Sequence, residues 1–342
     1  MSQISTVFWN NKGGTGKTSL AFQTISALAN NNKNKKILVL DVCPQANLSE
    51  LFLGGLEGNG SNNLLKIQGQ IPRATIGGYF QMRLPNPYNL TKLNYRDFVV
   101  KPSNYNEQIP GNIDLIAGDP LLELQANAMA TLANNQIPGT DTWVKVVSWI
   151  RDFISLTNDD YHYIFLDANP SFSIYTQTAM AAVDRIVIPV MADDSSRRAI
   201  QNAFSLVYGL KLPSEIYSQH NFATRMKAGG LALPKAHLIV KNRITQYMGP
   251  ASGYRAVLES IDKDVMSLLS NSNEFMSFLD LQSGLHEIRD FQTTGVVAFA
   301  RGAPFFTLMP GKRNVGGRRV AIDRKQIDDR RQEIEALAKK LE

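Results

Sequence analysis

The chain contains one cysteine, Cys43, among its 342 residues. A single thiol excludes an internal disulfide framework and is typical of a protein from a reducing cytosol. The sequence also lacks any run of roughly eighteen apolar residues, which excludes a membrane-spanning helix. The first ten residues do not have the pattern of a secretory signal, so we expect a cytoplasmic protein.

Acidic residues are missing from one part of the chain. Residues 221–255 include six basic side chains and no acidic one, and residues 301–342 include eleven basic and six acidic side chains. The whole chain has a net charge of +6, so these two segments carry +11 and the remainder carries −5. Positive charge therefore gathers in the C-terminal third, which favours an anionic partner.

Apolar runs rich in β-branched residues alternate with helix-like stretches along most of the sequence. This alternation predicts an α/β fold with a mostly parallel, twisted sheet flanked by helices, within one domain over residues 1–342. Strands are expected at 4–9, 37–40, 113–117, 163–166, 186–190 and 237–240. Helices are expected at 18–30, 121–133, 143–156, 174–182, 197–210 and 255–269.

Two segments differ from this pattern. Residues 54–111 are dense in glycine, asparagine and proline, which favours loops or a small irregular insertion, with or without a hairpin. Residues 323–342 form a polar helix pattern with one aliphatic side, and we expect that side to pack on the domain. The aliphatic residues are Ile327, Ile334, Leu337 and Leu341.

The sequence KGGTGKT at residues 12–18 stands between a predicted strand and a predicted helix. Such a turn gathers backbone N–H groups around one point, and the helix N-terminus adds partial positive charge, so the turn binds phosphate. Lys17 would reach the β- and γ-phosphates and the Thr18 hydroxyl would ligate Mg²⁺. A glycine turn that only caps a helix is the alternative interpretation. The nucleotide-binding residues are predicted to be Lys12, Gly13, Gly14, Thr15, Gly16, Lys17, Thr18 and Ser19.

The loop departs from G-x-x-x-x-G-K-[ST], because Asn11 stands at the first glycine position and Lys12 is an additional lysine. In this form it resembles the deviant Walker A loop of the ParA/MinD family of partitioning and positioning ATPases. The resemblance implies a P-loop fold, ATP and Mg²⁺ as cofactors, and an ATP-dependent homodimer. It also implies that Lys12 acts in trans on the nucleotide of the second subunit, with Lys17 and Asp41 as further catalytic residues.

Other segments extend the resemblance to about residue 245. DVCPQANLS is similar to the family's D-x-D-P-Q-x-N segment, and YIFLDANPSFS resembles its Walker B strand. The resemblance implies that Asp167 orients Mg²⁺ and its waters, and that Asn242 in HLIVKNRI contacts adenine. Because the loop begins at Lys12, we expect the small type of ParA protein, without an N-terminal DNA-binding extension.

One carboxylate of the family is replaced. The D-x-D motif reads Asp41, Val42, Cys43, and the family's second aspartate helps to position the attacking water. A thiol is mostly protonated at neutral pH and does not substitute for a carboxylate as an acceptor of hydrogen bonds from water. We therefore expect weak basal ATP hydrolysis, with binding and dimerisation retained and Asp41 taking over part of the role.

The resemblance further implies nonspecific DNA binding, a ParB-like or adaptor partner protein, and segregation or positioning of a cargo such as a plasmid in the nucleoid-associated cytoplasm. Phosphate contacts give sequence-independent, salt-sensitive attachment. The candidate DNA-binding residues are Arg225, Lys227, Lys241, Arg243, Arg255, Lys312, Arg313, Arg318 and Arg319. The alternative for each of them is a solvated basic surface.

Three other functions are weighed against this one. A nucleotide-gated scaffold with negligible hydrolysis fits Cys43. A MinD-like, membrane-associated ATPase would need large apolar anchors in a basic amphipathic helix, whereas residues 323–342 carry both charge signs and no aromatic residue. An iron-protein-like reductase is disfavoured, because one cysteine cannot supply the usual cluster ligands.

Overall fold

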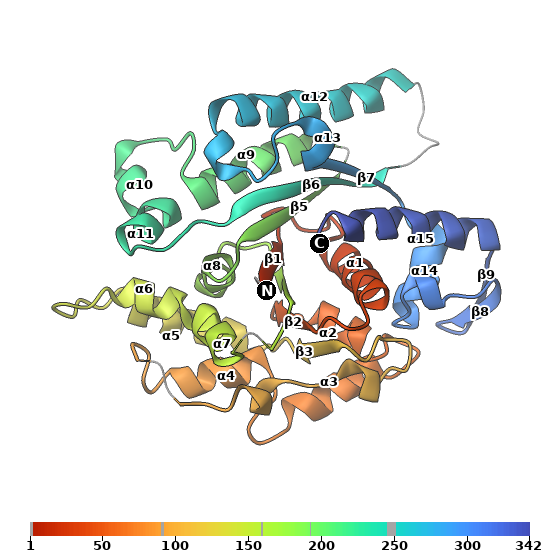
Figure 1. Ribbon diagram of the computed structural model, residues 1–342, viewed down its shortest axis with the longest axis horizontal. Coiled ribbons are helices and arrows are strands. Elements are labelled where there is room, and N and C mark those ends of the chain that lie inside the picture. The colour runs from red at the N-terminus through yellow and green to blue at the C-terminus, as the bar shows by residue number, and fades with distance from the viewer. Residues whose placement is uncertain (1–2, 90–91, 159, 192, 245–250) are drawn as a thin grey trace.

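The computed structural model describes residues 3–89, 92–158, 160–191, 193–244 and 251–342. Its centre is a seven-stranded sheet in the order β3-β2-β4-β1-β5-β6-β7, in which every neighbouring pair is parallel (Figure 1). The predicted parallel α/β fold is thus confirmed. The strands are β1 (Ile4–Phe8), β2 (Ile37–Val42), β3 (Ile113–Ile116), β4 (Tyr163–Ala168), β5 (Arg185–Met191), β6 (Lys235–Ile244) and β7 (Leu285–Arg289).

The strands are buried on both faces because their side chains alternate between two apolar clusters. Ile164 and Leu166 of β4, for example, belong to one cluster, and Tyr163 and Phe165 belong to the other. The first cluster is covered by α4 (Ile76–Arg83), α5 (Leu121–Ala133), α6 (Thr142–Val147), α7 (Trp149–Leu156), α8 (Ile174–Ala181), α9 (Asp194–Tyr208), α11 (Phe222–Ala228) and α12 (Ala251–Asn271). The second is covered by α1 (Lys17–Asn31), α2 (Asn47–Phe52), α3 (Gly60–Gln68), α14 (Gln292–Ala300) and α15 (Arg324–Lys339).

The predicted irregular insertion at 54–111 contains helices that the sequence interpretation did not expect. It contains α3, α4 and two single 3-10 turns (Tyr95–Phe98 and Pro102–Asn104), and none of its described residues form a hairpin. Ile76, Tyr79 and Phe80 of α4 are fully buried. Its glycines allow close packing: a Cβ on Gly78 would lie 1.9 Å from the carbonyl oxygen of Arg73.

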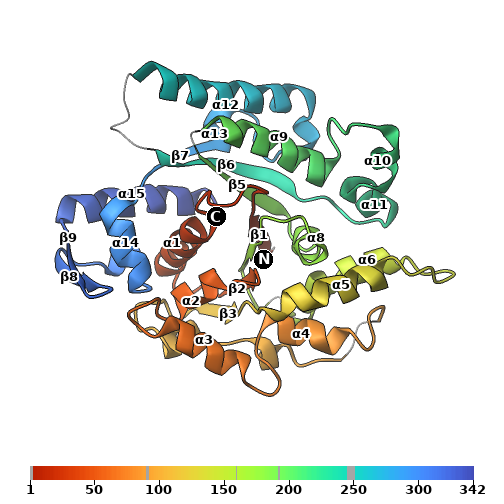
Figure 2. The same cartoon turned by 180° about the vertical axis from the view of Figure 1, so that it is seen from behind.

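The predicted C-terminal helix is confirmed as α15. It packs against α1, as Figures 1 and 2 show from opposite sides. Ile327, Ile334, Leu337 and Leu341 are all at most 3 % exposed, so the aliphatic side lies in the core as expected. No helix in the described ranges is long and apolar enough to cross a membrane.

Several elements of the structure were not predicted. The expected helix at 143–156 is two helices, α6 and α7, separated at Ser148. Strand β7 closes one edge of the sheet, and a separate two-stranded hairpin, β8 (Gly311–Val315) with β9 (Arg318–Ile322), precedes α15. Two short helices, α10 (Glu215–His220) and α13 (Leu281–Gly284), complete the list of α-helices that the structure describes.

Candidate nucleotide and magnesium site

The phosphate-binding motif forms the connection from β1, in the middle of the sheet, to α1. Gly14 and Gly16 have positive φ angles of +75° and +78°, which favour glycine. A Cβ on Gly16 would also lie 2.4 Å from the amide nitrogen of Asn242. The loop therefore has the conformation and the close packing that its glycines predict, at the carboxyl ends of the strands, where ligands bind in such folds.

Two asparagines hold the loop in place. Asn242 is 2 % exposed, and its Nδ2 donates to the carbonyl of Thr15 over 2.9 Å. Its Oδ1 accepts from the backbone N–H of Arg243, so this amide braces the loop, and its contact with adenine stays a prediction. Asn10 donates to the carbonyl of Pro189 and accepts from the backbone N–H of Lys12. Sequence reasoning missed Asn10, although a polar residue directly after a buried strand was a visible signal.

Lys17 begins α1 and is 8 % exposed. Burial lowers the pKa of its ammonium group, and the nearby Asp167 carboxylate opposes that shift. A desolvated ammonium at a helix N-terminus is well suited to bind phosphate, since it has few competing water contacts. Thr18 and Ser19 follow in the first turn of the same helix.

Two buried carboxylates lie side by side next to this helix. Asp41 and Asp167 are neighbours in the register of β2 and β4. Asp167 Oδ2 accepts from the Thr18 hydroxyl over 2.7 Å, and Asp41 Oδ2 accepts from the backbone N–H and hydroxyl of Ser49. Within the described residues, the other oxygen of each carboxylate is buried without a hydrogen-bond partner.

The electrostatics of this pair favour a cation. Burial and the neighbouring Asp167 carboxylate together raise the pKa of Asp41 to about 7, against the hydrogen bonds from Ser49. Burial raises the pKa of Asp167 to about 6, while the Thr18 hydrogen bond and Lys17 oppose the shift. Two orphaned carboxylate oxygens beside a threonine hydroxyl are the donor set that Mg²⁺ takes in phosphate sites, so these residues fit the metal that the motif implies.

Cys43 follows Asp41 at the end of β2 and is a free, half-buried thiol. Burial, together with the Asp41 and Asp167 carboxylates, raises the pKa of the thiol to about 12. The thiol is therefore fully protonated at neutral pH, and no third carboxylate stands at this position.

Lys12 forms an ion pair within its own chain. Its ammonium lies 2.7 Å and 2.6 Å from the two carboxylate oxygens of Asp193, and it also donates to the Ser196 hydroxyl. Burial raises the pKa of Asp193, but the hydrogen bonds from Lys12 and two serines outweigh it and bring the pKa to about 2. The side chains of Lys12 and Asp193 are 24 % and 41 % exposed, so the pair is accessible to water.

The basic residues of segment 221–255 do not share one surface. Lys241 is buried and ion-paired with Asp262 and Glu287, which makes it unsuitable for contact with DNA and corrects that assignment. Arg225 stacks on the Trp143 ring, with its guanidinium carbon 4.5 Å from the centroid. Arg243 lies beside Gly16 at the phosphate loop. Lys227 is exposed, and the side chain of Arg255 lies outside the described part of the chain.

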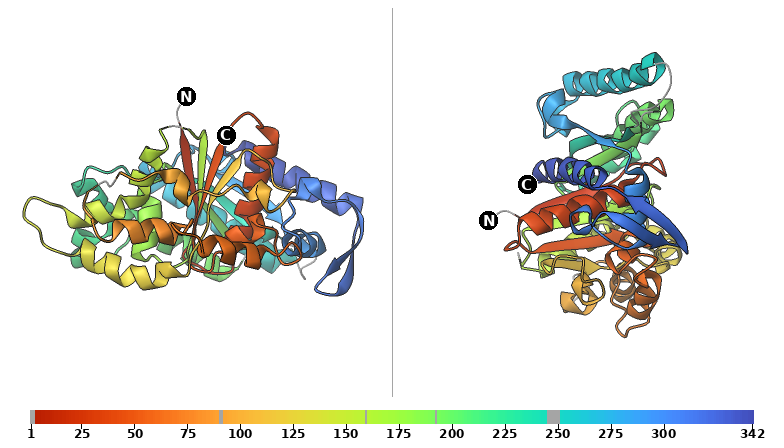
Figure 3. Two further views of the ribbon diagram at one scale, coloured as in Figure 1. Left: turned by 90° about the horizontal axis from the view of Figure 1, so that it is seen from below. Right: turned by 90° about the vertical axis from the view of Figure 1, so that its right-hand side faces the viewer.

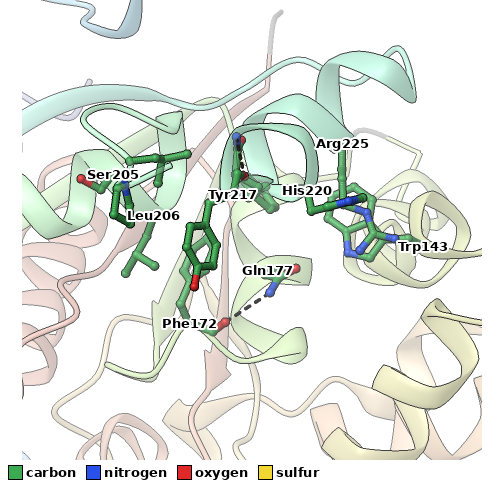
Figure 4. A pocket seen from close by; sticks show the side chains of 12 residues that line it. Trp143, Phe172, Gln177, Ser205, Leu206, Tyr217, His220 and Arg225 are labelled. Carbon is green, nitrogen blue, oxygen red and sulfur yellow. Dashed lines mark hydrogen bonds between the residues drawn. The ribbon is translucent and has the colours of Figure 1, made fainter. Parts of the chain in front are cut away.

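An apolar pocket of about 360 Å³ lies elsewhere, between α6, α8, α9 and α11 (Figure 4). It contains no residue of the phosphate loop. Its aromatic lining includes Trp143, with Arg225 stacked over it, and Phe172, whose carbonyl accepts from the Gln177 amide. The ring of Phe172 packs 5.4 Å from Trp9, which precedes the loop. The candidate site is therefore the loop with its two carboxylates, and the pocket lies beside it.

Comparisons with known proteins agree with this geometry. A family model described as an AAA domain, AAA_31, matches residues 3–213. The chromosome partitioning protein ParA of Myxococcus xanthus is 26 % identical over 184 residues, which cover 54 % of this chain and 50 % of that protein. The chain spans between half and two thirds of the length of the curated relatives that it matches.

Two solved structures share the fold. The ATP complex of a Cyanothece McdA variant has a TM-score of 0.64 at 15 % identity, with 99 % of this chain and 96 % of that one covered. The pNOB8 ParA bound to nonspecific DNA has a TM-score of 0.52 at 18 % identity, with 81 % and 80 % covered. At such low identity these likenesses concern the fold alone.

Proposed function

The chain belongs to the AAA_31 family and has the ParA-like P-loop fold, and from this premise we propose that it is an ATP-dependent, dimerising partition or positioning ATPase that binds nonspecific DNA. The observation that carries the proposal is the pairing of an additional loop lysine, Lys12, with a complete phosphate and metal site. Relatives whose names include ParA, and a neighbour bound to nonspecific DNA, support it further.

The nucleotide would lie along the loop, with its phosphates on the backbone N–H groups and on Lys17. Thr18 and Asp167 would hold Mg²⁺, and Asp41 would accept hydrogen bonds from its waters through the free Oδ1. When bound, Mg²⁺ neutralises charge on the phosphates. Neighbours of the same fold have been solved with ATP and with AMPPNP.

Dimerisation would require Lys12 to exchange its partner. In this chain Lys12 binds Asp193, whereas the proposed trans role places its ammonium on the nucleotide of the second subunit. The exposed pair contributes little stability by itself, so a phosphate can displace it. We expect Lys12→Ala to bind ATP but remain monomeric, and Asp193→Asn to dimerise at lower ATP concentration. Sedimentation with ATP and with ADP measures both, and a dimer of Lys12→Ala as stable as wild type would rule out the trans role.

ATP turnover is proposed to be slow, because Cys43 is a protonated thiol where the family has a carboxylate. Phosphoryl transfer depends on positioning and electrostatics, so this replacement affects turnover more than binding. A Cys43→Asp variant should hydrolyse ATP about tenfold faster or more, with Cys43→Ser as the uncharged control. Equal steady-state rates for wild type and Cys43→Asp would contradict the water-positioning argument.

DNA binding is proposed to follow the nucleotide state. A titration of labelled duplex with ATP, ADP or no nucleotide, at several salt concentrations, tests this directly. We expect tighter binding with ATP and a steep loss of affinity with salt. Binding that ignored both nucleotide and salt would remove the DNA switch. A ParB-like or adaptor protein that stimulates hydrolysis completes the proposed cycle.

A nucleotide-gated scaffold is the second candidate, and Cys43 is the observation that favours it. A scaffold would bind ATP, dimerise and recruit a partner without measurable turnover. The steady-state ATPase rate with and without DNA separates the two functions, because only the partition ATPase resets through hydrolysis.

A further inference from the structure

The β8–β9 hairpin is a small antiparallel ribbon that projects from the body of the protein (Figure 3, dark blue). Gly316 and Gly317 form its turn with positive φ angles of +55° and +79°, as expected for a two-residue hairpin loop. Residues 311–322 include four basic side chains and no acidic one. The hairpin is thus a concentrated positive element with a defined backbone.

The two faces of the ribbon differ. Residues directly opposite each other in an antiparallel pair share a face. Lys312 lies opposite Ala321, and Asn314 lies opposite Arg319, and all four are exposed. On the other face Arg313 and Val320 are half-buried, with Val315 and Val320 packed against the core. The inner face attaches the ribbon to the body, and the outer face is polar and free.

The exposed cations of the hairpin have no acidic partner in the described part of the chain. Among the described residues no ion pair involves Lys312, Arg319 or Arg318 at the turn, whereas Arg330 of the following helix pairs with Glu333. The Glu57 carboxylate contacts the turn of the hairpin, where its Oε1 accepts from the backbone N–H of Gly316 over 2.9 Å. The charge of the ribbon is therefore available to an external anion.

We propose that this hairpin is a ribbon that lies in the major groove of duplex DNA, with Lys312, Asn314 and Arg319 against the DNA and Arg318 at its tip. The inference rests on the proposed DNA-binding function and assigns it to one face of one element. A major groove roughly 12 Å wide admits a two-stranded β-ribbon. The cations neutralise phosphates, and the Asn314 amide supplies a donor and an acceptor to the groove without fixing a sequence.

The test compares two identical substitutions on opposite faces. Arg319→Ala removes an outward guanidinium and Arg313→Ala removes an inward one, and both lose one charge. With ATP and a labelled duplex, Arg319→Ala should weaken binding about tenfold and lower the salt slope by about one for each engaged subunit. Arg313→Ala should change affinity less than about twofold. Arg319→Lys keeps the charge and should restore most of the binding.

Competition and vesicle-binding experiments test which surface the hairpin binds. Methyl green, a major-groove ligand, should compete with the protein, and netropsin, a minor-groove ligand, should not. Equal losses for the two arginine variants, or competition by netropsin alone, would overturn the inference while leaving DNA binding intact. A loss of binding to phosphatidylserine vesicles without a loss on DNA would also overturn it, in favour of a lipid surface. Wild-type protein that binds no duplex with ATP would instead refute the proposed function itself.

Discussion

Basic side chains have two environments in this protein. In and around β6, Lys241 is 4 % exposed and held between Asp262 and Glu287, and Arg225 of α11 is stacked on an aromatic ring. On the β8–β9 hairpin, Lys312 and Arg319 face solvent without an ion pair in the described structure. The first group stabilises the fold, and the second is left to meet a partner. Charge that is neutralised inside a protein cannot also bind a polyanion.

The largest effect on stability is expected from the buried carboxylates Asp41 and Asp167. Folding raises both pKa values above the ordinary 3.8, to about 7 and about 6, so the folded state binds more protons than the unfolded one between about pH 4 and 7. Stability of the metal-free protein should therefore fall as pH rises through this window, by several kcal/mol. Urea unfolding at pH 5 and pH 7.5 measures the fall.

Asp41→Asn is the control, because it removes one charge of the pair and should flatten the pH dependence. His237 and His286 have pKa values lowered by burial and act in the opposite direction in both proteins. ATP with Mg²⁺ should also flatten the wild-type curve. A wild-type stability that rises from pH 5 to pH 7.5 more steeply than that of the variant would contradict the raised carboxyl pKa values.

Replacement of Lys241, the buried cation of β6, should have the second-largest effect on stability. Lys241→Met leaves Asp262 and Glu287 without their partner, and we expect a loss of about 3 kcal/mol in unfolding free energy. Lys235→Met, an exposed lysine on the same strand, is the matched control and should stay within about 0.5 kcal/mol of wild type. A Lys241 variant that is fully stable but deficient in DNA binding would reverse the comparison.

The stacked arginine should have an intermediate effect. Arg225→Ala loses the contact with Trp143, for an expected loss of about 1 kcal/mol in stability. Lys227→Ala, two residues further along α11, serves as the exposed control. Thermal unfolding of both variants measures this loss. Equal transition temperatures would mean that the stacking contributes nothing to stability.

Removal of the hairpin cations should hardly change the free energy of unfolding. The double variant Lys312→Ala/Arg319→Ala should unfold within about 0.5 kcal/mol of wild type, because both side chains are exposed and form no ion pair with the residues that the structure describes. Denaturant titration measures it. A loss as large as that expected for Lys241→Met would show that the hairpin charge is structural, and the contrast between the two regions would disappear.

The strands of the sheet were predictable because each is a short apolar run buried on both faces. The edge strand β7 escaped detection, since LHEIR is half polar and only Ile288 is fully buried. The β8–β9 hairpin was not predicted, although Gly316 and Gly317 between basic residues were a turn signal. Glycines also led to a helix being missed. Gly77 and Gly78 suggested a loop, whereas they lie in α4 and allow it to pack tightly on its neighbours.

For the candidate site, the sequence predicted the roles of the loop residues and of Asp167, and these remain predictions that the geometry supports. The structure added two contacts of the loop: Asn242 donates to the Thr15 carbonyl, and Asn10 donates to the Pro189 carbonyl. The place of Asn10 directly after a strand was a signal, but its contact was not, because an asparagine looks the same in a sequence whether its amide meets a base or a backbone carbonyl.

The sequence by itself determined the phosphate loop, because KGGTGKT between a strand and a helix is a local feature whose glycines and helix start need no distant partner. Tertiary structure alone decided which charges are free. Lys12 meets Asp193 across 181 residues of sequence, and Lys241 meets Glu287 across 46. Ion pairing depends on distances that only the folded chain sets, so Lys241 became part of an internal ion-pair cluster, whereas Lys312 and Arg319 lie on an exposed ribbon.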